Sequence, residues 1–354
     1  MMNISALFQN RSRRTWITAG AIVALLAIIA FAAVNATATP RNPVEVQIQG
    51  WIADLQSDKL TATRQQAQRN LERAGQSAVP QLLVALRSNN SALRRNAADM
   101  LGYIASPQAT EALANALRND PVPAVRRNAA YALGEIHEAR AINALQQAAV
   151  ADPSRIVRGT AADSLARVRT ILAKAANVNE QHIGAYAAAP SQQDLVYVAA
   201  KRDIWASRDG GKTWGTLSNV LPSQVTALTV NPTKAQELYA GTEGMGIFKS
   251  IDGGATWMAV NDGIVLTPGA REAITAIAID PDNANVLYIA RGAWVGTSSV
   301  QFYPNGLMVS RDGGETWIAL NVGSNAEAIA KLAFRDGQLY GLAGDRVLAL
   351  ATPQ

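Results

Sequence analysis

The chain has 354 residues, of which 49% are hydrophobic and 17% charged, a composition that predicts folded domains. It contains no cysteine and two histidines, which excludes disulfides, thiolate-bound zinc, iron–sulfur clusters, a cysteine nucleophile and a three-histidine metal site. The net charge is +5, with three arginines and no acid in residues 1–40, +6 in residues 41–175 and −4 in residues 176–354. This asymmetry predicts two folded domains of different surface character behind a basic leader.

The leader, residues 1–40, combines a basic cluster with an apolar run. Three arginines between Arg11 and Arg14 precede Ile17–Val34, 18 residues without a charge. As a helix this run would be about 27 Å long, close to the hydrocarbon thickness of a bilayer. The charge step predicts an inner or cytoplasmic membrane location, with residues 41–354 on the periplasmic or extracytoplasmic side. Two interpretations stay open: a signal peptide cleaved near Ala36-Thr37-Ala38, or a retained transmembrane anchor.

Residues 41–175 contain an internal repeat. Four strings recur at spacings of 30, 32 and 32 residues, each followed by a leucine at the same offset. The strings are Thr63–Ala67, Leu93–Ala97, Val125–Ala129 and Val157–Ala161, and the leucines are Leu71, Leu101, Leu133 and Leu165. Such a period indicates stacked units, none of which can bury its apolar face alone.

Each unit is predicted to be a helical hairpin. Apolar residues three and four apart predict second helices over Val79–Leu86, Ala109–Leu117 and Ala141–Ala149. Asp120-Pro121 and Asp152-Pro153 are expected to start helices, with the aspartate as N-cap and proline at the first helical position. Asp58 holds the matching place in the first unit.

Residues 44–175 resemble HEAT repeats of the short, phycobilisome-lyase-type variety, on the strength of the Leu/Val-Arg-x-x-Ala-Ala-x-x-Leu-Gly strings at 93–102 and 125–134. The resemblance implies a protein-binding α-solenoid, and no residue pattern indicates bilin chemistry. A series of arginines recurs at Arg64, Arg94, Arg126 and Arg158. It could bind phosphates, or it could bind helix-end carbonyls and the capping aspartate of a neighbouring repeat. We expect the second, with no nucleic-acid partner, because +6 over this region is no polybasic stripe.

After Ala176 the hydrophobic period changes to two, and three near-identical strings of the form Ser-x-Asp-Gly-Gly-x-Thr-Trp appear. They resemble the Asp-box, or bacterial neuraminidase repeat, which implies a hairpin. The aspartate accepts amide hydrogen bonds within its own turn, the glycines supply positive φ, and the tryptophan packs back over the turn. We therefore assign structural rather than catalytic roles to Ser207, Asp209, Gly211, Trp214, Ser250, Asp252, Gly254, Trp257, Ser310, Asp312, Gly314 and Trp317.

The strands around each box predict a small β-propeller of about four blades over residues 176–354. In the clearest copy, strands A to D are Val225–Val230, Glu237–Gly241, Gly246–Ser250 and Thr256–Val260. The other A strands are expected at His182–Ala187, Ile274–Ile279 and Ile329–Phe334. The fourth blade has a strand C at Arg346–Leu350 but neither an Asp-box nor a strand D. Either a strand near Asn177–Gln181 closes the ring, or an edge stays open for a partner.

Asp-box propellers include sialidases, sortilin-type receptors and assembly factors of photosynthetic membrane complexes. Arg202, Arg271 and Arg291 could be nominated as a sialidase carboxylate clamp, with Tyr303 and Glu272 as the nucleophile pair, but no sialidase arginine motif precedes the boxes. The acidic stretch 280–285 is interpreted as a turn between strands rather than a calcium loop. We therefore expect no enzymatic activity, no catalytic or metal site and no cofactor.

The third blade carries two insertions, Ile264–Glu272 and Gly292–Asn305, which the blade topology places on one face, opposite the Asp-boxes. They contain aromatic and arginine residues of the kind that anchor interfaces. Either they bind a partner, or they pack on each other to cover the core. The candidate partner-binding residues are Arg271, Arg291, Trp294, Phe302 and Tyr303.

The sequence as a whole predicts a membrane-tethered, exported, non-enzymatic scaffold, assembly factor or accessory subunit. Its partners would be subunits of a membrane protein complex, with photosynthetic or electron-transport complexes as candidates, and no small-molecule substrate is expected. The rival interpretation is a carbohydrate-binding or glycosidase-like protein of the cell envelope.

Overall fold

The structure is a computed structural model that describes residues 42–177, 183–217, 221–266, 271–295, 301–321 and 329–350. Its contacts divide the chain into Met1–Gly50 and one compact unit, Trp51–Gln354. The apolar run Ile17–Val34 lies outside the described residues. Among the helices that are described, none combines the length and the apolar character needed to cross a membrane.

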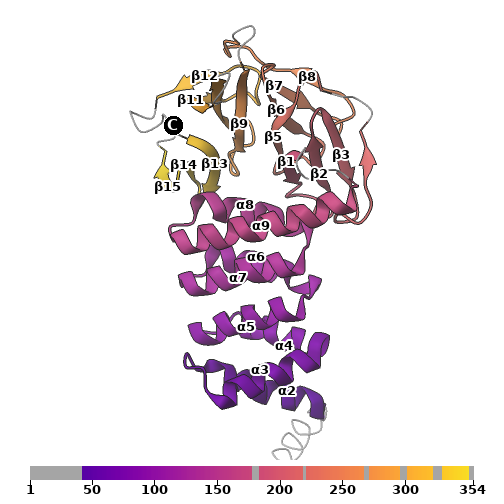
Figure 1. The fold of residues 1–354 in the computed structure, drawn as a ribbon, viewed down its shortest axis with the longest axis vertical. Coiled ribbons are helices and arrows are strands. Elements are labelled where there is room, and N and C mark those ends of the chain that lie inside the picture. Colours follow the sequence, from indigo (N-terminus) through magenta and orange to yellow (C-terminus); the bar gives the residue numbers. More distant parts are fainter. Residues whose placement is uncertain are drawn as a thin grey trace, which may run out of the picture. The chain divides into compact units, whose positions relative to one another are not determined.

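The helical repeats are present as paired helices that stack on one another (Figure 1). Helices α5, α7 and α9 pack side by side in that order. Helices α4, α6 and α8 are the second helices of the hairpins, and each also packs against the helix that follows it in the chain. The helices are α2 (Pro43–Ala53), α3 (Ala62–Ala74), α4 (Val79–Ala85), α5 (Ser91–Ile104), α6 (Thr110–Asn119), α7 (Pro123–Ile136), α8 (Ile142–Ala151) and α9 (Arg155–Ala175).

The small residues of the repeated strings allow the close packing of α5 against α7. Ala97, Ala98, Ala129 and Ala130 are buried. A Cβ added at Gly102 would lie 2.9 Å from Cα of Ala132, closer than real Cβ atoms approach. The glycine that ends the strings at 93–102 and 125–134 is therefore a packing requirement of the stack.

The arginine series forms a ladder that connects successive repeats. Arg94 donates from Nε and Nη2 to the carboxylate of Asp120, at 2.6 and 3.1 Å, and from Nη1 to the carbonyl of Ser88 at 2.8 Å. Arg126 repeats the pattern on Asp152, at 2.7 and 3.0 Å. The expectation that these arginines bind helix-end carbonyls and a neighbouring aspartate is confirmed.

The aspartates themselves do not cap the helices that follow them, so that prediction was wrong. Asp120 and Asp152 are the C-caps of α6 and α8, and α7 begins only at Pro123. Each carboxylate accepts the amide two residues ahead, at 2.9 Å from Val122 and 2.8 Å from Ser154. The polar turn is thus closed by the aspartate before the helix begins.

In the first unit the prediction for Asp58 was also wrong. The N-cap of α3 is Thr61, whose side chain accepts the amide of Arg64 at 3.2 Å. Asp58 instead forms an ion pair with Arg95 at 3.0 Å.

The remainder of the described chain is four small antiparallel sheets, as the strand pattern predicted (Figure 1). Three have four strands in chain order, and the fourth has three described strands. The strands are β1 (Ile183–Ala188), β2 (Val196–Ala200), β3 (Asp203–Ser207) and β4 (Gly215–Thr216); β5 (Val225–Val230), β6 (Leu238–Thr242), β7 (Ile247–Ser250) and β8 (Met258–Ala259); β9 (Arg271–Ile279), β10 (Leu287–Val295), β11 (Gln301–Ser310) and β12 (Ile318–Leu320); and β13 (Ile329–Arg335), β14 (Gln338–Ala343) and β15 (Arg346–Ala349).

The first strands of the four sheets follow one another around the propeller, with β5 against β1, β9 against β5 and β13 against β9. Helix α8 contacts both β1 and β13, the two ends of this series. Asn143 and Gln146 donate to the carbonyls of Ala188 and Tyr186 at 2.8 and 3.3 Å, and Gln147 donates to the carbonyl of Phe334 at 2.6 Å. The last hairpin of the solenoid thus bridges the first and last blades, an arrangement the sequence did not suggest. The closing strand expected near Asn177–Gln181 falls almost entirely outside the described residues.

The fourth blade also continues the arginine ladder. Arg158 has no following repeat to bind, and its Nη2 donates to the carbonyl of Asp345, in the turn before β15, at 2.9 Å. Arg335, at the end of β13, reaches the buried carboxylate of Asp152 at 3.5 Å. The fourth blade therefore supplies the contacts of the last arginine and the last aspartate of the ladder.

Candidate functional site

The Asp-boxes form self-contained hairpin turns. In the first, Asp209 accepts the amide of Thr213 at 2.9 Å and its hydroxyl at 2.6 Å. Ser207 donates to Asp209 at 2.7 Å and accepts the amide of Gly211 at 2.7 Å. The same bonds recur around Asp252 and Asp312. The glycines of the boxes have φ between 73° and 94°, which favours glycine.

These bonds hold the carboxylates in the charged form. Hydrogen bonds from Thr256 and Ser250 lower the pKa of Asp252 to about 2. Burial opposes the shift at Asp312, but the bonds from Thr316 and Ser310 still lower its pKa to about 2. The pKa of Asp209 is lowered in the same way, mainly by Thr213. Carboxylates held in this form are poor proton donors at neutral pH.

The box tryptophans differ from one another. Trp214 and Trp257 donate from Nε1 to the carbonyls of Gly211 and Gly254, at 2.9 and 3.1 Å, within their own turns. Trp317 is 2% exposed and donates to the carbonyl of Val260 in the preceding blade, at 2.9 Å. Trp317 therefore joins two blades. The sequence did not reveal this, because all three tryptophans follow the same Ser-x-Asp-Gly-Gly-x-Thr pattern.

The third blade carries the candidate partner-binding residues, and its second insertion is a β-hairpin rather than an irregular loop. Strands β10 and β11 have nine and ten residues, where the corresponding strands of the other blades have four to six. We call the paired strands β10 and β11, residues 287–295 and 301–310, the long hairpin. The expected loop forms a ladder because its apolar and aromatic residues continue the register to Val295 and Gln301.

The register places the candidate residues in two cross-strand rows. Trp294 lies opposite Arg271 on one side and Phe302 on the other. In the next row Ala293 lies opposite Glu272 and Tyr303. Because neighbouring rows project to opposite faces of a sheet, Trp294 and Tyr303 lie on opposite faces of the hairpin. The residues are thus close in the fold without forming one continuous patch.

Their exposure separates the candidates. Trp294 is 40% exposed and Tyr303 is 53% exposed. Arg271 is exposed and forms an ion pair with Glu243 at 2.7 Å. Arg291 is largely buried, bound to Glu272 at 3.1 Å and to the carbonyl of Val265 at 2.9 Å. Arg291 therefore fixes the segment before β9 to the hairpin.

Sequence analysis did not single out two further exposed apolar residues of this region. Val295 continues β10 next to Trp294 and is 54% exposed, and Val265 is 75% exposed. Strict alternation of apolar and polar residues would have signalled a half-buried strand, but here adjacent Trp294 and Val295 are both apolar. Within the described residues no group of three or more histidine or acidic side chains could hold a metal ion.

Comparisons with known proteins fall on the same two parts of the chain. A model of HEAT repeats matches residues 48–123 and 79–166. The Sortilin–Vps10 model, described as sortilin, neurotensin receptor 3, matches residues 202–338. The resemblances drawn from the sequence are confirmed for both segments.

Curated relatives match a short stretch. The oligoxyloglucan-reducing end-specific xyloglucanase of Emericella nidulans is 33% identical over 93 residues, which is 26% of this chain and 10% of that protein. A probable enzyme of the same name from Neosartorya fischeri is 34% identical over 93 residues, 25% of this chain and 10% of that protein. The chain spans about a tenth of the length of these relatives.

Solved structures are also similar. A GH74 enzyme of Niastella koreensis has 25% identity and a TM-score of 0.37, over 47% of this chain and 26% of that one. The phycocyanin lyase complex from a Nostoc species has 28% identity and a TM-score of 0.33, over 36% of this chain and 80% of that one.

The expectation that the chain is not an enzyme is contradicted by the two xyloglucanase relatives, whose sequences match a quarter of it. The lack of a sialidase arginine motif does not exclude other activities, because one fold can carry several unrelated activities. By sequence and structure together, the chain joins HEAT repeats, within residues 48–166, to a β-propeller segment similar to that of the sortilin family, within residues 202–338.

Proposed function

We propose that this protein is a protein-binding scaffold and that a partner binds the long hairpin of its third blade. The observation that supports this is the exposure of Trp294 and Tyr303 on opposite faces of strands about twice as long as their counterparts. Aromatic side chains on a rigid element carry much of the binding energy in protein interfaces. A hairpin with an aromatic residue on each face suits insertion into a groove of the partner.

The proposed partner is a membrane protein complex on the exported side of a membrane. Support comes from the arginines before Ile17–Val34 and from the HEAT repeats, an architecture that commonly binds proteins. The compact unit of residues 51–354 would then be presented as one body beside the membrane.

The test compares matched replacements of exposed apolar residues. Trp294→Ala and Tyr303→Ala, singly and together, are expected to release the protein from the complex purified in mild detergent, while its melting temperature changes little. Met258→Ala and Ile251→Ala, which remove exposed apolar side chains from the second blade, serve as controls and should leave association intact. Retained association of the Trp294 and Tyr303 double variant would refute the proposal.

A second candidate function is action on a carbohydrate. It is supported by the xyloglucanase relatives and by two carboxylate–arginine pairs on the inserted face, Glu243 with Arg271 and Glu272 with Arg291. Incubation of the purified chain with xyloglucan oligosaccharides, followed by mass spectrometry, tests it. Shorter oligosaccharides would support the function. If the Glu272→Gln variant produced none, the activity would be assigned to the inserted face. Unchanged oligosaccharides would count against it.

A further inference from the structure

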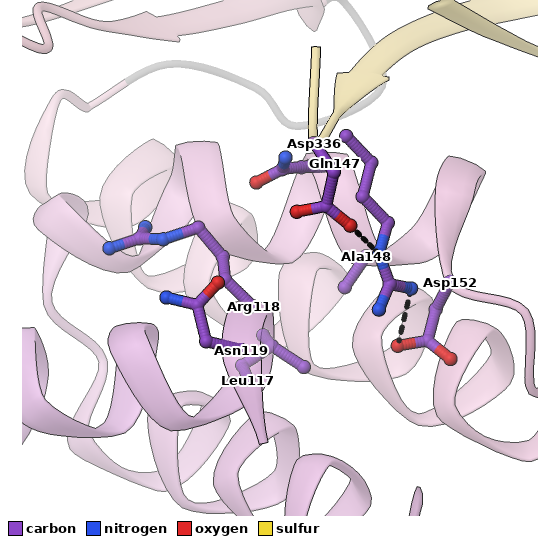
Figure 2. A pocket seen from close by; sticks show the side chains of 8 residues that line it. Leu117, Arg118, Asn119, Gln147, Ala148, Asp152 and Asp336 are labelled. Atoms are coloured by element: carbon purple, nitrogen blue, oxygen red, sulfur yellow. Dashed lines mark hydrogen bonds and ion pairs between the residues drawn. The ribbon is translucent and has the colours of Figure 1, made fainter. Parts of the chain in front are cut away.

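A polar pocket of about 210 Å³ lies beside the contact between α8 and the fourth blade (Figure 2). The end of α6 supplies Leu117, Arg118 and Asn119, and α8 supplies Gln147 and Ala148. Asp152 follows α8, Arg335 ends β13, and Asp336 lies in the turn before β14. The pocket is thus built from both the solenoid and the propeller.

Most charges of this pocket are already compensated. The carboxylate of Asp152 is bound by Arg126 at 2.7 Å and by Arg335 at 3.5 Å. Arg335 also faces Asp336 at 3.4 Å. Arg118 is half-buried, and its guanidinium forms no hydrogen bond or ion pair with the described residues. Its guanidinium therefore offers up to five N–H donors to a ligand.

The pocket also offers hydrogen-bond acceptors. Gln147 uses its Nε2 on the carbonyl of Phe334, and Asn119 uses its Nδ2 on the side chain of Asn115. Each amide keeps an oxygen that can accept a bond from a peptide N–H. Donors for a carboxylate and acceptors for a peptide backbone therefore lie around one cavity.

A second, larger hollow of about 550 Å³ shares Asn119 with the lining of the pocket and is lined by residues of α4 and α6. Its apolar lining comes from Leu83, Leu86, Ala112 and Ala116, and its charged lining includes Arg87, Glu111 and Asp120. Asp120 is paired with Arg94, and Arg87 is exposed. Ala112 and Arg118 are six residues apart on α6, which corresponds to about 9 Å, or about three residues of an extended chain.

We infer that these two hollows form one groove that binds an extended segment of a partner protein, with a Glu or Asp side chain on Arg118 and an apolar side chain between α4 and α6. The inference rests on the proposed scaffold function and names a second contact that the long hairpin does not make. The carboxylate is favoured because Arg118 is the charge left without a partner in the first hollow. The extended form is favoured because side-chain amides match the donors and acceptors of an unpaired backbone.

The probes are fluorescein-labelled peptides in a Ser/Thr background that carry one Glu and one Leu three positions apart, in both orders, together with Glu→Gln and Leu→Ser counterparts. Fluorescence anisotropy is measured with the full chain. The Glu-containing peptide of one of the two orders is expected to bind. The affinity of its Gln counterpart should be lower by a factor of about ten or more.

Arg118→Ala should remove the preference for Glu over Gln, and Arg118→Lys should retain part of it. The matched control is Arg73→Ala, because Arg73 is likewise the arginine in the last turn of its helix, α3, but is exposed and lies outside the lining of both hollows. No binding of any peptide, equal binding of Glu and Gln peptides, or an equal loss in Arg73→Ala would overturn the inference. The hairpin variants should bind the peptides normally, so failure of the scaffold proposal at Trp294 and failure of the groove give different results.

Discussion

At the scale of single residues, Arg126 and Asp152 form a buried ion pair between neighbouring helices of the solenoid. The two side chains are 4% and 1% exposed and are joined by two hydrogen bonds. Breaking such a pair leaves a charge without a partner in a place that water does not reach.

Arg126→Ala is therefore expected to destabilise the protein by about 3–5 kcal/mol. Its neighbour on the same helix, Arg127, is exposed, and among the described residues its side chain bonds to Asn128 alone, so Arg127→Ala should cost about 1 kcal/mol or less. Urea unfolding followed by circular dichroism measures both. Equal effects of the two replacements would show that the ladder does not stabilise the stack.

The Asp-boxes predict a specific dependence of stability on pH. Asp252 and Asp312 have pKa values near 2 in the folded protein, against 3.8 for the unperturbed side chain. A lowered folded-state pKa gives stability that is present above the unfolded value and is lost as the pH falls through the folded value. The melting temperature should thus be insensitive to these groups above about pH 5 and should fall between about pH 4 and pH 2.

Asp252→Ala should lower the melting temperature at neutral pH by about 3 °C, because the turn loses its acceptor. Asp252→Asn keeps one acceptor oxygen but cannot titrate, and it should reduce the acid-dependent part of the fall. A full acid-dependent fall in Asp252→Asn would contradict the assignment.

At the scale of elements, helix α8 has two functions in the fold. One face packs in the solenoid, and three side-chain amides bind backbone carbonyls at the edges of the first and fourth blades. Leaving a buried carbonyl without a donor destabilises the folded protein by more than a typical hydrogen bond stabilises it.

Gln147→Leu is expected to destabilise the protein by about 1–3 kcal/mol, because the carbonyl of Phe334 loses its donor at 2.6 Å. The same replacement at Gln66, which is exposed and bonds within its own helix, is the control. Thermal denaturation distinguishes them. An unchanged melting temperature for Gln147→Leu would show that the fourth blade does not depend on this bond from α8.

At the scale of the whole molecule, the predicted domain boundary at residues 175 and 176 is open to a direct test. The compact unit extends over Trp51–Gln354 and includes both the solenoid and the propeller. The ends of the blade series contact a helix of the solenoid, and the last arginine of the ladder contacts the propeller.

We expect a chain of residues 183–354 alone to lack a cooperative thermal transition, because the edges at β1 and β13 would lose the amides of α8 and the apolar surface beneath it. Addition of a separately produced chain of residues 42–177 should restore the transition. Scanning calorimetry of the full chain should show one transition. A propeller that melts cooperatively by itself would instead support two independent domains.

The sequence by itself determined the repeating units. The Asp-box turn is closed by bonds between residues two to four apart, and the helical strings place their apolar residues and small alanines within one or two turns. Such local interactions are encoded in short strings, so both architectures could be predicted from the sequence. The tertiary structure alone decided how the units join. Asn143, Gln146 and Gln147 resemble the surface of any helix, and Trp317 resembles the other box tryptophans. Their roles depend on which strand edge or carbonyl lies opposite them, and that is set by the stacking of segments as many as 187 residues apart in the chain.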